Sequence, residues 1–72
     1  MPYAKNQDLP DQVRNVLPEH AQDIYRGAFN SAWDTYSDQT QDRREETAHR
    51  VAWAAVKRRY RKAGGQWVAR DD

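Results

Sequence analysis

Five cations and a tyrosine stand together near the end of the chain, in residues 57–62 (KRRYRK). Such a run can contact nucleic-acid phosphates, an anionic lipid surface or an acidic loop of a protein. The alternative is structural, because cations in the last turns of a helix stabilise the negative end of its dipole and can pair with acidic groups of the same molecule. If the run is helical, it forms a continuous cationic surface, with Arg50, Lys57 and Arg61 on one face and Arg58 and Lys62 on the neighbouring one.

The large aromatic side chains offer a second kind of contact, because aromatic residues dominate binding hot spots. Most of them are needed to fill the core of so small a domain. If one of them is exposed, we expect it to be Trp67, because it lies beyond the last predicted helix. The candidate partner-binding residues are therefore Arg50, Lys57, Arg58, Arg61, Lys62 and Trp67.

The two histidines, His20 and His49, lack the neighbours that a metal or catalytic site requires. Neither has a histidine or cysteine three or four residues away, and His49 beside Glu45 and Glu46 is better explained as a surface or boundary group. No loop has the alternating oxygen ligands of a calcium site, and no serine or threonine lies in a nucleophile-elbow motif. We therefore predict no catalytic residue, no metal site, no cofactor and no enzymatic activity.

Length and composition limit the fold to a single domain over residues 1–72. The chain has no cysteine, which excludes disulfides and thiolate chemistry. The longest apolar run, residues 51–56, is much shorter than the roughly 20 residues of a membrane helix. The sequence therefore predicts a cytoplasmic protein that does not span a membrane.

The net charge of +1 hides an uneven distribution. Residues 1–42 carry three Lys or Arg against seven Asp or Glu, a net charge of −4, whereas residues 43–72 carry nine against four, a net charge of +5. The two halves are expected to attract each other if they pack side by side. This attraction is the structural alternative to an external partner.

Hydrophobic periodicity predicts three helices. The first covers residues 9–17 and ends before Pro18, which disfavours the helical conformation of the preceding residue. The second begins at Pro18 and continues to Tyr36, with an apolar residue at every third or fourth position. Gly27 interrupts this pattern and suggests a close approach of another backbone.

The third predicted helix follows the polar loop 37–41. Asp42 is the expected N-cap and forms a capping box with Glu45, while the Gly64-Gly65 pair is expected to end the helix. A short loop and two apolar faces predict that the second and third helices form an antiparallel hairpin.

Two short segments, residues 2–4 and 66–69, read as extended and are expected to pair across the ends of the helices. The predicted fold class is therefore mostly α (α+β), with three helices, the last two as an antiparallel hairpin, and a small β-sheet from the terminal segments.

Three continuous blocks of sequence carry a family resemblance: residues 21–25 (AQDIY), 28–36 (AFNSAWDTY) and 44–57 (REETAHRVAWAAVK). With Tyr60, Lys62 and Trp67 they resemble the ChaB family of small cation transport regulators, over about residues 2–68. The resemblance implies three helices with a small sheet, no enzymatic activity and no cofactor. It also implies regulation of a sodium/calcium–proton antiporter. Related domains fused to a module like the N-terminal part of the Rho terminator point toward nucleic acid.

Our leading hypothesis is a non-enzymatic regulatory module that docks on a protein partner, a membrane cation/proton antiporter by the resemblance. The alternative is a small nucleic-acid-binding module that uses the same cations to contact phosphates. A third interpretation is a structural subunit of a homo-oligomer, because self-association can stabilise so small a domain.

Overall fold

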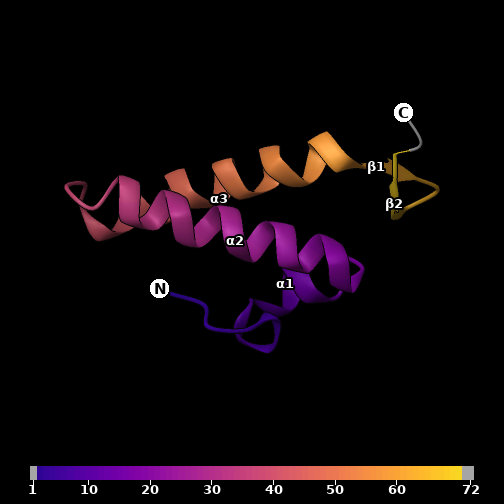
Figure 1. Cartoon of the computed structure of the whole chain (residues 1–72), viewed down its shortest axis with the longest axis horizontal. Helices are drawn as coiled ribbons and strands as arrows, with labels where there is room; N and C mark the ends of the chain where they lie inside the picture. Colours follow the sequence, from indigo (N-terminus) through magenta and orange to yellow (C-terminus); the bar gives the residue numbers. More distant parts are fainter. Residues whose placement is uncertain (1, 71–72) are drawn as a thin grey trace.

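The computed structural model describes residues 2–70 of the chain (Figure 1). Its elements follow in the order η1 (Asn6–Asp8), α1 (Asp11–Arg14), α2 (Glu19–Thr35), α3 (Gln41–Arg59), β1 (Tyr60–Ala63) and β2 (Gln66–Ala69). The mostly helical fold class, with three helices and a two-stranded antiparallel sheet, is confirmed.

The two long helices, α2 and α3, lie side by side as an antiparallel hairpin and make the largest interface of the domain (Figure 1). Alanines allow the two backbones to approach closely, since Ala21 of α2 and Ala48 and Ala52 of α3 are fully buried. Tyr25 and Phe29 fill the remaining volume. The buried apolar residues form one cluster: Leu9, Val13, Leu17, Ala21, Tyr25, Phe29, Ala32, Ala48, Ala52, Val56 and Tyr60.

The first predicted helix is shorter than expected. Only Asp11–Arg14 is α-helical, with Pro10 as its N-cap, because the segment lies between prolines at 10 and 18. Leu9 and Val13 are buried as the periodicity predicted, but Val16 is 46% exposed.

The prediction that residues 2–4 pair with residues 66–69 is wrong. The only sheet in residues 2–70 joins β1 to β2. The backbone of Tyr3 instead bonds to the side chain of Asn30 in α2, through Tyr3 N to Oδ1 (3.2 Å) and Nδ2 to Tyr3 O (2.8 Å). The side-chain amide thus satisfies the backbone groups that a β-strand would otherwise have satisfied.

The third helix also ends earlier than predicted. It stops at Arg59, and the next residue, Tyr60, is already extended (φ −132°, ψ 154°) and begins β1. Gly64 and Gly65 have positive φ angles of 58° and 81°, so they form the two-residue turn of a β-hairpin instead of a helix cap. The buried ring of Tyr60 anchors this hairpin to the core.

Two local predictions on the long helices are also wrong. The N-cap of α3 is Thr40, whose hydroxyl accepts from the backbone N of Arg43, so Asp42 lies inside the first turn and does not cap it. Gly27 is exposed, and a Cβ built there would meet no atom within 4 Å. No backbone therefore approaches this glycine closely.

Candidate functional site

Four of the five candidate cations, all except Arg50, lie with Arg59 at the end of the domain where α3 passes into the β-hairpin (Figure 1). Lys57, Arg58 and Arg59 occupy the last turn of α3, where they complement the helix dipole. Arg61 and Lys62 follow on β1, and all five side chains are exposed. We call these five residues the basic end.

The helical grouping expected for the basic end does not hold beyond Arg59. Successive residues of a strand point to opposite faces, so Arg61 and Lys62 lie on opposite faces of the hairpin. Lys62 is paired with Trp67 in the register, and Arg61 is paired with Val68. The structure therefore places Lys62 beside Trp67, and it places Arg61 on the other face of the hairpin.

Ion pairs do not neutralise the basic end within residues 2–70. The three ion pairs of this part of the chain are Arg14–Asp11, Arg26–Asp23 and Arg50–Glu46, and each joins two residues of the same half of the sequence. The expected attraction between an acidic and a basic half thus forms no close pair among these residues. One contact does tie down the basic end, because Nε of Arg70 donates to the carbonyl of Lys57 (2.9 Å).

Arg50 differs from the other candidate residues. It lies about two turns before Lys57 on α3, and its guanidinium donates to Glu46 at 3.0 Å. Both side chains are well exposed, so this pair contributes little to stability. The structure nevertheless gives Arg50 an acidic partner that the basic end does not have in the described part of the chain.

Trp67, the aromatic residue that the sequence indicated as the most exposed, is half-buried. Its ring lies 5.5 Å from that of Trp53, centroid to centroid, and packs against the core. Trp67 also lines a hollow of about 280 Å³ together with Val16, Pro18 and Gln66. On the hairpin, Lys62 therefore shares a face with Trp67, whereas Arg61 lies on the opposite face.

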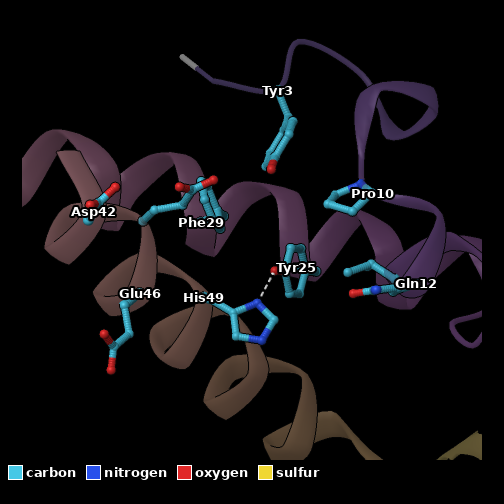
Figure 2. Close-up of a pocket in the computed structure, with 10 residues that line it drawn as sticks. Tyr3, Pro10, Gln12, Tyr25, Phe29, Asp42, Glu46 and His49 are labelled. Carbon is cyan, nitrogen blue, oxygen red and sulfur yellow. Dashed lines mark hydrogen bonds between the residues drawn. The ribbon is translucent and has the colours of Figure 1, made fainter.

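His49 takes part in a contact that the sequence reading missed. Its Nδ1 lies 2.7 Å from the hydroxyl of Tyr25 (Figure 2). Its ring also meets the Trp53 ring edge-on. Burial is the main cause that raises the pKa of the Tyr25 hydroxyl far above its ordinary value, and the nearby Tyr3 and Glu45 make smaller contributions. The spacing of His49 four residues before Trp53 places it at the edge of the apolar stripe, and that signal was available in the sequence.

Residues 2–70 show no cluster of three or more histidine, aspartate or glutamate side chains that could hold a metal ion. Over the same residues, no helix has the length and apolar character needed to cross a bilayer.

These features define a small helical-hairpin domain whose α3 carries a basic β-hairpin at its end. The ChaB family model matches residues 9–70, and the chain belongs to the ChaB family. The family resemblance drawn from the sequence is thereby confirmed.

Named relatives are similar over most of their length. A protein of Escherichia coli (strain K12), named "Putative cation transport regulator ChaB", is 62% identical over 66 residues, covering 86% of this chain and 87% of the relative. A protein of the same name from Shigella flexneri shows the same identity and coverage. A solved structure, "NMR solution structure of the putative cation transport regulator ChaB", matches with a TM-score of 0.86 at 53% identity, over 97% of this chain and 100% of that one.

Proposed function

We propose that this protein regulates cation transport as a non-enzymatic interaction module. In this proposal the basic end and the adjacent edge of Trp67 dock on an acidic segment of a cation/proton antiporter. The names of the relatives, at 62% identity, support the regulatory role. The partner is a protein with a negatively charged segment, and the docking takes place where that segment faces the cytoplasm.

The observation that carries the docking surface is the exposed charge of the basic end, which forms no ion pair within residues 2–70, beside a hollow lined by Val16, Pro18 and Trp67. Charge complementarity between such a surface and an acidic segment speeds association and selects the partner. The hollow lined by Val16 and Trp67 offers room for one apolar side chain of that segment. An acidic peptide that contains a single large apolar residue therefore fits both parts of the surface.

A chemical-shift titration of the labelled protein with cytoplasmic peptides of the antiporter tests this proposal. We expect shifts at residues 57–62, at Trp67 and at Val16. The double variant Arg58→Gln, Lys62→Gln should weaken binding about tenfold or more, because two exposed charges are lost, one of them on the Trp67 face, while no described hydrogen bond is removed. Trp67→Ala is less useful, because loss of its packing against Trp53 also disturbs the hairpin.

Arg43→Gln provides the matched control, since Arg43 is an equally exposed arginine in the first turn of α3, at the other end of the helix. It should change the affinity by less than about twofold. Equal weakening by the control and by the double variant would show a non-specific charge effect and overturn the site. Shifts outside the basic end and the hollow would overturn it as well.

Duplex DNA and single-stranded RNA form the second arm of the titration. Binding through phosphates weakens steeply between about 50 and 200 mM salt. If nucleic acid binds at residues 57–62 with that salt dependence and the antiporter peptides do not bind, the nucleic-acid alternative replaces the regulatory proposal.

A further inference from the structure

A second hollow lies away from the basic end, between the N-terminal segment and the first half of α3 (Figure 2). Its volume is about 360 Å³, which is within the range of sites that hold a small ligand or a single large side chain. Four rings line it: Tyr3 from the N-terminal segment, Tyr25 and Phe29 from α2, and the imidazole of His49 from α3. The ring centroids of Tyr3 and Phe29 are 4.9 Å apart, and those of Tyr25 and Phe29 are 5.9 Å apart.

The α3 side of this hollow is acidic. Asp42, Glu45 and Glu46 line it, and none of its lining residues is a lysine or an arginine. Burial is the main cause that raises the pKa of Tyr3, and the negative charge of Glu45 raises it further. At Tyr25, burial is again the main cause, and Tyr3 and Glu45 add to it. The negative charge of Glu45 is therefore felt at both tyrosines that line the hollow.

The neighbouring carboxylate, Glu46, serves a different purpose. It accepts from the guanidinium of Arg50, and Figure 2 shows its side chain directed away from Tyr3 and Tyr25. The two adjacent glutamates thus differ in whether their charge is already paired, and this difference affects how strongly each attracts a cationic ligand. Glu46 has a cationic partner, whereas no ion pair of Glu45 occurs within residues 2–70.

We propose that this hollow binds an arginine side chain of a protein partner. A guanidinium is planar, stacks on aromatic faces and donates in parallel to a carboxylate, so it matches both the rings and Glu45. The domain already stacks one arginine on an aromatic ring: Arg44 lies 4.1 Å from the centroid of the Trp33 ring, and there its Nε donates to the backbone carbonyl of Trp33 (2.7 Å) in place of a carboxylate. Charge complementarity selects a basic segment as the occupant.

This inference does not depend on the proposed function. The basic end attracts an acidic segment, whereas the aromatic hollow attracts a basic one, and the two surfaces share no residue. A partner that carries both kinds of segment would contact two separate faces of the domain.

The probe for the test is N-acetyl-arginine amide, and its control is N-acetyl-citrulline amide, which has nearly the same shape without the charge. In a chemical-shift titration of the full chain, the arginine derivative should move the ring signals of Tyr3, Phe29 and His49. The citrulline derivative should bind about fivefold more weakly or worse. Equal binding of the two derivatives, or no binding of the arginine derivative, would overturn the proposal.

Two substitutions of adjacent residues sharpen the test. Glu45→Gln should weaken binding of the arginine derivative about fivefold, whereas Glu46→Gln should change it less than twofold, because Glu46 is already engaged by Arg50. Both residues are exposed, so both variants should fold, and unchanged amide spectra of α2 will verify this. Equal effects of the two substitutions would contradict the assignment of Glu45. N-acetyl-lysine amide binding as tightly as the arginine derivative would contradict the specificity for arginine.

Discussion

The side chain of Asn30 holds the backbone of Tyr3 through two hydrogen bonds, of 3.2 and 2.8 Å, which join α2 to the N-terminal segment. A side-chain amide carries a donor NH2 group and an acceptor carbonyl oxygen, so it can bond to both polar groups of a single backbone residue. Asn30 is only 8% exposed, and the Tyr3 ring packs on Phe29 one residue away. This one contact fixes both the path of the N-terminal segment and the wall of the aromatic hollow.

Replacing Asn30 by alanine should lower the free energy of unfolding by about 1–3 kcal/mol, because the polar backbone groups of Tyr3 lose their partner in a partly buried place. Urea unfolding measures the loss. The adjacent exposed Ser31→Ala is the control, and it should stay within about 0.5 kcal/mol of the parent. A loss of similar size in both variants would mean that the Asn30 contact contributes no stability.

Phe29→Ala should cost about 3–5 kcal/mol, which is comparable to the whole stability of a domain of this size. Phe29 is 3% exposed and contacts the rings of Tyr3, Tyr25 and Trp33. A thermal melt followed by circular dichroism measures the effect. Val51→Ala, at a position that is 38% exposed, serves as the comparison and should cost much less. A loss below about 1 kcal/mol for Phe29→Ala would contradict the described core.

The same glycine-to-alanine change should have opposite signs at two positions. Gly27→Ala should stabilise the protein by about 0.5–1 kcal/mol, because the position is helical, exposed and open to a Cβ. Gly64→Ala should destabilise it by about 1 kcal/mol or more, because φ there is +58°. Parallel urea unfolding of the two variants compares them. Stabilisation by both changes would contradict the positive φ of the hairpin turn.

Stability should fall at alkaline pH because of Tyr25. Burial is the main cause that raises its folded-state pKa far above the ordinary value of 10.0, with smaller contributions from Tyr3 and Glu45. Below about pH 10 the Tyr25 hydroxyl stays protonated in both the folded and the unfolded protein, so its contribution to stability is fully present. Above about pH 10 the hydroxyl ionises first in the unfolded protein, and the folded protein is destabilised progressively as the pH rises. Urea midpoints at about pH 9 and pH 11 measure this loss.

Tyr25→Phe is the control for that pH dependence. It removes the ionisable hydroxyl and the contact with His49, so it should lower stability at neutral pH while reducing the further loss between about pH 9 and pH 11. An alkaline loss of the same size in the variant would show that another group causes it.

The sequence predicted the long helices well because their apolar periodicity continues over many turns and agrees with the packing that buries it. It predicted the end of α3 badly because a Gly-Gly pair suits both a helix C-cap and a hairpin turn. The pairing of Tyr60 with Ala69, together with the burial of the Tyr60 ring in the core, decides between the two, and the local sequence does not show that burial.

The candidate site was predicted in composition and not in geometry. The sequence shows the cations of the basic end. Which face of the domain each of them occupies depends on the change from helix to strand at Tyr60, and the sequence did not predict that change. The role of Asn30 could not be predicted, because a polar residue on a helix gives no sign of which distant backbone it will bind. The aromatic hollow likewise depends on the path of the N-terminal segment.

The absence of any loop between Arg59 and β1 limits the shape of a partner. Arg61 and Lys62 point away from each other across a ribbon one strand thick, so a planar surface, whether a bilayer or a flat protein face, touches only one of them. A partner that contacts both Arg61 and Lys62 must reach around the edge of the β-hairpin to its other face, as a flexible loop can. If the basic end is the docking surface, as proposed above, a flexible acidic loop therefore suits it better than a flat partner surface does.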